Sequence, residues 1–408
     1  MPENRFIRSI RLANLLSFGP DGMQIELGPL NVLIGPNASG KSNLIETISL
    51  LKSLPIDLQE PLRRGGGASE WMWKGEGAQG GASLDVAVGG TVGNYLLGVG
   101  PIRHYLRFAP TGYAPMVMLL EEFIEDGELL GQQPGGSEFY SYNLGGKPSF
   151  GGQQLSLPIA PSEQNTEAEK IDPGQSILAQ RRDPGGYPQI TLLAWSYMLI
   201  KMYRKWNLSR SSVPRLPQRS DEPGDFLLED ARNLGMVLNH LENQTGNPLN
   251  RIEQFMRECH PGVQRISTKV DSGTVQVFIH EKGFASPVPA IRISDGMLRY
   301  LCLLTVLLHP NPPPLICIEE PEIGLHPDVI HIVGQVLKDA ATRTQLIVTT
   351  HSDLLVSELS DTPESVIICE RDAGGTHMHR LDPDKLKDWL TEYSLGHIWL
   401  SGELGGTL

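Results

Sequence analysis

Three glutamates lie close together in the segment LICIEEPEIGLHP, residues 315–327. Glu319, Glu320 and Glu322 follow four apolar residues bounded by turn-forming residues, and such a short apolar run predicts a buried strand. Carboxylates at the end of a buried strand are costly unless another group there needs them. A strand that ends in adjacent acids is suited to holding a metal ion and activating a water molecule.

A second segment supplies the phosphate chemistry that such carboxylates serve. Residues 35–42, GPNASGKS, fit the pattern G-x-x-x-x-G-K-[ST] at every fixed position, after an apolar strand and before a helical run. The glycines let backbone N–H groups close around phosphates, and the helix N-terminus favours an anion. We expect Lys41 to meet the β- and γ-phosphates and Ser42 to bind Mg²⁺. The nucleotide-binding candidates are Gly35, Pro36, Asn37, Ala38, Ser39, Gly40, Lys41, Ser42 and Asn43.

A phosphate loop in the same chain gives each glutamate a role. Glu319 is predicted to hold Mg²⁺, directly or through water, and Glu320 to act as the general base that activates the attacking water. His351 ends another apolar strand, QLIVTTHS, and is predicted to sense the γ-phosphate. The alternative for His351 is a polar residue that only terminates the strand.

A further anion site is predicted at residues 294–297, SDGM, which precede the helical run MLRYLCLLTVLL. A Ser or Asp cap with an adjacent glycine leaves free N–H groups at a helix N-terminus. Ser294 and Gly296 are the candidates. The alternative is an ordinary helix cap.

Composition limits the class of protein. The 408 residues contain 40% hydrophobic and 20% charged residues, as expected for a globular protein with a substantial core. No apolar run is long enough to span a membrane, the start lacks the apolar region of a signal peptide, and the four cysteines are far apart. These features predict a cytoplasmic protein with reduced cysteines and no membrane partner.

The net charge of −13 argues against a general nucleic-acid-binding surface, but one basic segment is an exception. Residues 201–220 contain six basic residues and no acid, with Tyr203 and Trp206 between them, so phosphates and stacked bases could both be met. The alternative is a solvated basic helix end. The nucleic-acid candidates are Lys201, Arg204, Lys205 and Arg210.

The pattern of helices and strands expected around these residues predicts an α/β fold. Helix and strand alternate in the last quarter, which implies a mainly parallel sheet flanked by helices. The Gly-rich region after the first helix indicates an antiparallel β subdomain, and the next region indicates a helical insertion. The predicted segments are 1–60 (phosphate-loop part of the core), 61–160 (β subdomain), 161–265 (mostly helical insertion), 266–370 (second part of the core) and 371–408 (tail).

Taken in order, GPNASGKS, SDGMLRYL, ICIEEPEIGLHP and TTHSD resemble the ABC-type ATPase heads of the SMC, RecF and overcoming-lysogenization-defect families, most of all the compact bacterial RecF-like predicted ATPases. The resemblance implies ATP and Mg²⁺ as ligands. It also implies a homodimer in which Ser294 and Gly296 touch the γ-phosphate held by the other subunit. Gln180 is the candidate for a glutamine that contacts Mg²⁺ and the attacking water. Met297 and Glu319 depart from the usual pattern but remove no essential chemical group.

The same resemblance suggests the biological setting. It implies a DNA-linked process, DNA repair or phage defence, with a separately encoded effector such as a nuclease, because too few residues follow His351 for a fused nuclease domain. No sustained heptads occur between the phosphate loop and the signature segment, SDGM at residues 294–297, so a long coiled-coil arm is excluded. Two alternatives are the nucleotide-binding subunit of a transporter and a non-hydrolysing ATP-binding scaffold that restrains a toxin partner.

Overall fold

The structure is a computed structural model that describes residues 5–77, 80–89, 91–92, 95–96, 101–112, 116–127, 130–131, 135–151 and 171–405. The chain divides into two compact units. Unit 1 comprises residues 1–200, 367–381 and 404–408, and unit 2 comprises residues 201–366 and 382–403. The predicted segment boundary at residue 160 lies outside the described residues.

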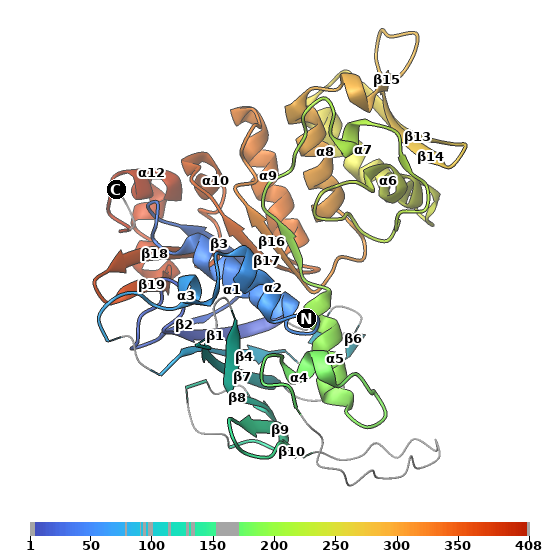
Figure 1. The fold of residues 1–408 in the computed structure, drawn as a ribbon. Helices are drawn as coiled ribbons and strands as arrows, with labels where there is room; N and C mark the ends of the chain where they lie inside the picture. Colours follow the sequence, from blue (N-terminus) through green and yellow to red (C-terminus); the bar gives the residue numbers. More distant parts are fainter. Residues whose placement is uncertain are drawn as a thin grey trace. The chain divides into compact units, whose positions relative to one another are not determined.

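Unit 1 contains a seven-stranded antiparallel sheet in the order β10-β9-β8-β7-β4-β1-β2 (Figure 1). The Gly-rich region was predicted to form antiparallel β structure, and this is confirmed; the first two strands of the chain join the same sheet. Its strands are β1 (Ile7–Ala13), β2 (Met23–Glu26), β4 (Ala82–Val88), β7 (Ile102–Pro110), β8 (Val117–Asp126), β9 (Glu138–Asn143) and β10 (Ser149–Phe150), and β5 (Thr91–Val92) pairs separately with β6 (Tyr95–Leu96).

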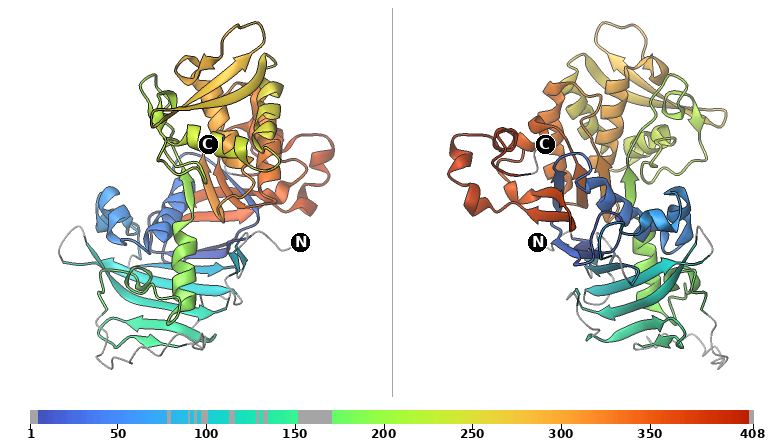
Figure 2. Two further views of the ribbon diagram at one scale, coloured as in Figure 1. Left: turned by 90° about the vertical axis from the view of Figure 1, so that its right-hand side faces the viewer. Right: turned by 60° about the vertical axis from the view of Figure 1, so that its left-hand side comes forward.

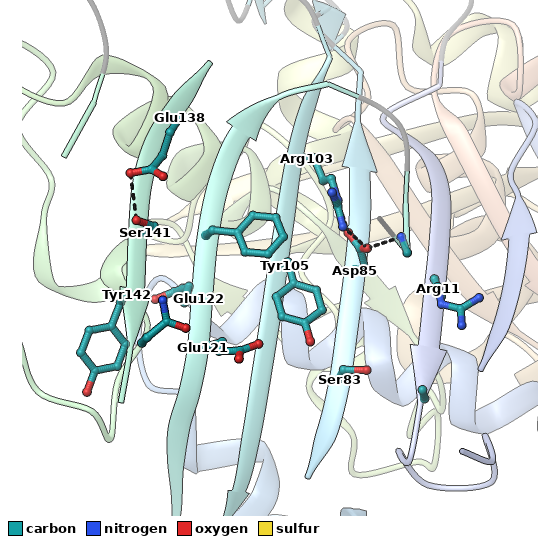
Figure 3. Close-up of a pocket in the computed structure, with 14 residues that line it drawn as sticks. Arg11, Ser83, Asp85, Arg103, Tyr105, Glu121, Glu122, Glu138, Ser141 and Tyr142 are labelled. Atoms are coloured by element: carbon teal, nitrogen blue, oxygen red, sulfur yellow. Dashed lines mark hydrogen bonds and ion pairs between the residues drawn. The ribbon is translucent and has the colours of Figure 1, made fainter. Parts of the chain in front are cut away.

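Side-chain alternation gives this sheet two different faces. His104 and Glu122 share one face, where Tyr197 of α5 (Pro188–Met198) contacts the His104 ring, and Figure 2 shows α5 crossing the sheet. Arg103 and Tyr105 belong to the opposite face, which is polar (Figure 3). The shorter helices of unit 1 are α2 (Gln59–Arg64), α3 (Ala68–Trp71) and α4 (Ile177–Gln180).

The remainder of unit 1 carries the phosphate-loop segment. Strand β3 (Leu30–Ile34) is buried along its whole length and leads into α1 (Lys41–Ser53). Beside β3 lies β18 (Val366–Asp372), which forms an antiparallel hairpin with β19 (Gly375–Arg380). Residues near the C-terminal end of the chain therefore complete the surroundings of a loop near its start.

Unit 2 contains the predicted parallel strands. β11 (Lys201–Tyr203), β16 (Leu315–Glu319) and β17 (Gln345–Thr349) are parallel neighbours in that order, which confirms the parallel part of the fold class. The two long helices of unit 2, α8 (Asp295–Leu307) and α9 (Pro327–Ala340), contact each other. The pattern at residues 191–206 predicts one continuous helix, whereas the chain leaves α5 at Met198 and enters β11. Burial of Met202 and Tyr203 beside β16 overrides the local helical pattern.

A second sheet of unit 2 packs against two helices, α6 (Leu234–Asn243) and α7 (Leu249–Cys259), which in turn contact α8 (Figure 1). Its strands run in the order β12 (Gln218–Arg219), β14 (Thr274–Glu281), β13 (Val263–Asp271), with β15 (Val288–Pro289) also paired to β14. The apolar run AIRI, residues 290–293, favours a strand by its sequence, but it forms the 3-10 turn Ala290–Arg292 followed by extended Ile293.

The remaining short helices lie in unit 2. They are α10 (Asp353–Ser357), α11 (Pro383–Leu386) and α12 (Leu395–Leu400), with α10 packed on α12. None of the helices in the described part of the chain combines the length and the apolar character that crossing a bilayer requires.

Candidate functional site

The phosphate loop folds over its own lysine. Gly35, Ala38 and Gly40 have positive φ angles of 142°, 65° and 104°, so the backbone turns sharply between β3 and α1. The residue Lys41 is only 6% exposed. Its ammonium donates hydrogen bonds to the carbonyl oxygens of Gly35 (2.7 Å) and Pro36 (2.8 Å). The ammonium is thereby held against the loop, at the N-terminal end of α1.

The β18–β19 hairpin packs against this loop. A Cβ on Gly35 would lie 2.2 Å from the carbonyl oxygen of Cys369, and a Cβ on Gly40 would lie 2.3 Å from Thr376 Oγ1. The buried Thr376 hydroxyl lies within hydrogen-bond distance of the Ser39 carbonyl oxygen (3.0 Å) and of Ser17 Oγ (2.7 Å). Both glycines are thus required by close packing as well as by φ. The sequence pattern identified the glycines but gave no signal for Thr376, which is 337 positions from Ser39.

A cavity of about 480 Å³ opens beside the first turn of α1. Its lining includes Ser17, Asn43, Trp73 and Arg371, all from unit 1. The indole of Trp73 offers an aromatic surface, while Asn43 and Arg371 offer polar groups. Asn43 was singled out from the sequence; Trp73 and Arg371 were not, because they lie far from any motif.

The glutamate pair lies at the end of β16 in unit 2. Glu319 is the last residue of the strand, and its carboxylate forms an ion pair with Arg204, with Nε and Oε1 3.1 Å apart. Glu320 has left the strand, with a φ of +50°, and its N–H donates to the carbonyl oxygen of Thr349 (2.9 Å). The two adjacent carboxylates therefore have different neighbours.

The structure brings Glu320 and His351 together. Glu320 Oε1 lies 3.6 Å from His351 Nε2, and both side chains are partly exposed. Glu322 positions the histidine, because its Oε1 accepts hydrogen bonds from Thr350 Oγ1 (2.7 Å) and from the His351 backbone N–H (3.0 Å). Glu322 was noted in the sequence as a third acid, but its positioning role was missed.

The signature segment begins α8. Ser294 is the N-cap, and its hydroxyl oxygen accepts from the Met297 N–H at 3.2 Å. A Cβ on Gly296 would lie 2.9 Å from the carbonyl oxygen of Gly324, so this glycine permits a close approach between the helix start and the loop after β16. Capping and close packing both account for these residues locally.

Gln180 is engaged in a local turn of unit 1. Its side-chain oxygen accepts from the Asp172 N–H (2.8 Å), and its amide nitrogen donates to the carbonyl oxygens of Gln175 (2.9 Å) and Asp172 (3.1 Å). Contact with a metal ion or water would require these hydrogen bonds to break.

The basic segment is less uniform than its sequence suggests. Lys205 and Arg210 are exposed, Lys201 is half-buried in β11, and Arg204 faces Glu319. Arg215 is 1% exposed. Tyr203, predicted to stack on bases, is 3% exposed and packs against Trp206; its strand, β11, pairs with β16 at the edge of a sheet.

A larger cavity, about 550 Å³, lies on the polar face of the unit 1 sheet (Figure 3). At its edge the buried Arg103 makes two 2.8 Å hydrogen bonds to Asp85 and one of 2.9 Å to Glu125. Burial disfavours the guanidinium charge, but the two carboxylates outweigh this and raise the pKa of Arg103. The same carboxylates accept backbone N–H groups from Gly131, Gly135 and Gly136. We interpret this cluster as structural, because it ties the loop after β8 to the sheet.

The fold and these motifs define a phosphate-loop NTPase of the ABC-ATPase type with the fold of an SMC head. Residues 30–94 and 146–357 match the family described as "AAA domain, putative AbiEii toxin, Type IV TA system", and the chain belongs to that family. It therefore carries an AAA-type phosphate-loop domain. A comparison with curated proteins finds no match.

Solved structures of SMC heads are similar over almost the whole chain. An SMC head bound to the C-winged helix domain of ScpA is 13% identical, with a TM-score of 0.59, and the match covers 93% of this chain and 99% of that chain. An SMC head with an extended coiled coil, bound to the C-terminal domain of ScpA and derived from Pyrococcus furiosus, is 11% identical, with a TM-score of 0.57, covering 95% and 99%. At these identities the likeness concerns the fold.

Proposed function

We propose that the chain binds and hydrolyses ATP and dimerises around the bound nucleotide. The observation that carries this proposal is the pairing of Glu320 with His351 at 3.6 Å, in a chain that also has a fully formed phosphate loop. A chain that had lost hydrolysis would have no need to hold a carboxylate and an imidazole together at the end of a strand. This pairing favours an ATPase over a non-hydrolysing scaffold.

Each motif residue has a role in this proposal. Lys41 neutralises the β- and γ-phosphates, Glu320 accepts the proton of the attacking water, and His351 orients the γ-phosphate end of the nucleotide. Ser42 and Glu319 would hold Mg²⁺, and both offer the oxygen atoms that this ion prefers. When bound, Mg²⁺ would offset phosphate charge. Gln180 would join this group only after release from its turn.

We also propose that the adenosine part of ATP occupies the cavity beside α1. Asn43 follows the phosphate loop directly and lines that cavity with Trp73. About 480 Å³ lies within the size range of small-molecule sites, and an aromatic surface with a few polar groups suits a purine and its ribose. This assignment adds Trp73 and Arg371 to the candidate nucleotide contacts.

In the proposed dimer, each ATP contacts both subunits. The N-terminus of α8, with Ser294 and Gly296, would donate N–H groups to the γ-phosphate held by the other subunit. Closure then depends on the γ-phosphate, and hydrolysis reopens the dimer, because ATP has a differential affinity for the two states.

The proposed biological role is DNA-linked: phage defence or repair, with a separate effector protein. The family description names a putative toxin of a toxin–antitoxin system, which favours defence. The exposed Lys205 and Arg210, with Lys201 and Arg204, form the proposed contact to nucleic acid. The cytoplasm is the proposed location.

The central experiment is light scattering on the Glu320→Gln variant with and without ATP and Mg²⁺. Glutamine keeps the shape of the side chain but removes the base, so bound ATP persists. We expect the solution mass to shift from monomer to dimer with ATP, and the shift to disappear when Ser294→Arg is added. Glu364→Gln, a change outside every motif, is the matched control for the lost charge. A mass that does not respond to ATP, with ATP binding intact, contradicts the proposed dimer.

A further inference from the structure

Arg215 is an arginine of the basic segment that is buried inside unit 2. It lies in the 3-10 turn Val213–Arg215, and its side chain is 2% exposed. Its Nε donates to the carbonyl oxygen of Leu208 (2.7 Å), and Nη1 donates to the carbonyl oxygens of Ala290 (3.1 Å) and Ile293. Its Nη2 donates to Asp295 Oδ1.

Three of these four acceptors lie in residues 290–295, which lead into the signature and include its first two residues. Residues 290–294 form a 3-10 turn followed by two extended residues, so the Ala290 and Ile293 carbonyls lie outside regular strand pairing. A guanidinium offers donors in a fixed planar fork, and it can hold several carbonyl oxygens at once. Arg215 supplies to this irregular segment the hydrogen bonds that a helix or sheet would otherwise provide.

The contact with Asp295 is unusual in its exposure. The Asp295 side chain is 77% exposed, whereas the guanidinium that it meets is buried. Asp295 lies between Ser294 and Gly296, so the Arg215 guanidinium contacts the signature itself. Buried charges are retained only with close partners, because an unpaired charge in the interior is strongly destabilising. The position of the guanidinium and the position of residues 290–295 are therefore mutually dependent.

We infer that Arg215 is a positioning residue that holds Ser294 and Gly296 in the conformation that receives the γ-phosphate of the other subunit's ATP. This inference rests on the proposed function, which assigns that role to the signature. It removes Arg215 from the basic surface that the sequence pattern suggested. Arg204, from the same segment, pairs with Glu319, so residues 204–215 reach both the metal-ligand candidate and the signature.

The test compares Arg215→Met with Arg219→Met in the Glu320→Gln background. Arg219 is a neighbouring arginine whose side chain is 76% exposed and pairs with Asp221 on the surface, so its loss should change nothing. Binding of a fluorescent ATP analogue is measured at protein concentrations that keep the chain monomeric, and dimerisation is measured by light scattering. For Arg215→Met we expect nucleotide affinity within about twofold of the parent and dimerisation weakened by at least about tenfold.

The conservative variant separates positioning from bulk stability. Arg215→Lys keeps the charge but loses the fork, so dimerisation should recover only in part. Dimerisation of Arg215→Met equal to the parent overturns the inference, and so does an equal loss of monomer ATP binding, which indicates a general structural defect. If Arg215→Met does not fold, Asp295→Asn decides: weaker dimerisation supports the inference, and unchanged dimerisation overturns it. A parent that stays monomeric with ATP overturns the proposed function itself.

Discussion

At the scale of single residues, a difference in the backbone angle φ directs two neighbouring glutamates to different partners. Glu319 completes the extended strand and meets Arg204, while Glu320 takes a φ of +50°, a region that non-glycine residues rarely occupy. The resulting turn brings Glu320 to His351. Strain of this kind costs roughly 1–3 kcal/mol and is characteristic of functional positions. The different neighbours of the two glutamates are compatible with the roles proposed for them, metal binding by Glu319 and base catalysis by Glu320.

Gly40→Ala tests whether the geometry of the phosphate loop is required. The added Cβ would lie 2.3 Å from Thr376 Oγ1 at a φ of +104°, so the loop must shift away from the β18–β19 hairpin. If the strain of about 1–3 kcal/mol falls on the nucleotide-binding conformation, ATP affinity should drop roughly 5- to 150-fold. Calorimetric titration with a non-hydrolysable ATP analogue measures this loss of affinity. Gly262→Ala is the control, because nothing lies within 4 Å of the added Cβ there. Equal affinities for the two variants would refute the requirement.

At the scale of elements, the sequence predicts contiguous motifs well. The phosphate loop, the helix at residues 41–53 and the strands at 315–319 and 345–349 follow from short patterns, because their period and their turn residues are local. What local patterns cannot predict is which distant element packs behind a motif. Thr376 and Arg215 have no motif of their own, and their roles come from contacts with residues 337 and 80 positions away.

Short elements were also the least predictable. Residues 201–203 carry a helical pattern but form a three-residue strand, and the AIRI run forms a 3-10 turn. In both places tertiary contacts decide: β11 gains backbone pairing with β16, and Arg215 takes the carbonyl oxygens of the 290–293 segment.

The segment after α8 should make unit 2 sensitive to acid. His309 is 2% exposed and packs edge-on against Phe226, and burial lowers its pKa to about 4. An unfolded histidine has a pKa near 6.5, so between these values the unfolded chain binds more protons and stability falls as the pH falls. The full contribution above pH 6.5 is about 3 kcal/mol. Most of it should be lost by pH 4.

Comparison with His309→Gln isolates this contribution from those of the carboxylates. Urea unfolding followed by tryptophan fluorescence, at intervals from pH 7 to pH 4, should give a steeper loss of stability for the unaltered chain than for the variant. His326→Gln is the control, because the His326 side chain is 72% exposed and should leave the slope unchanged. Parallel slopes for the unaltered chain and His309→Gln would show that His309 titrates normally.

At the scale of the whole molecule, the proposed dimer makes every nucleotide site a joint product of two chains. In a two-fold symmetric dimer the phosphate loop of one subunit meets the signature of the other, and the reverse holds at the second site. A defect in either motif then disables both sites of a homodimer. Two defective chains can nevertheless complement each other, because a mixed dimer contains one site with both motifs intact.

Mixing Lys41→Met with Ser294→Arg tests this arrangement directly. Each variant alone should show almost no ATP hydrolysis. Lys41→Met lacks phosphate binding, and in Ser294→Arg the large arginine side chain blocks the signature. In an equal mixture, half of the dimers are mixed and each has one intact site, so up to roughly a quarter of the parent rate should return. The matched control is Lys41→Met mixed with the double variant Lys41→Met/Ser294→Arg, which contains no intact phosphate loop and should stay inactive. Activity of Ser294→Arg alone, or no recovery in the mixture while both chains remain folded, would mean that the signature does not act across the dimer. Each subunit would then hydrolyse ATP without the other's help, or not at all.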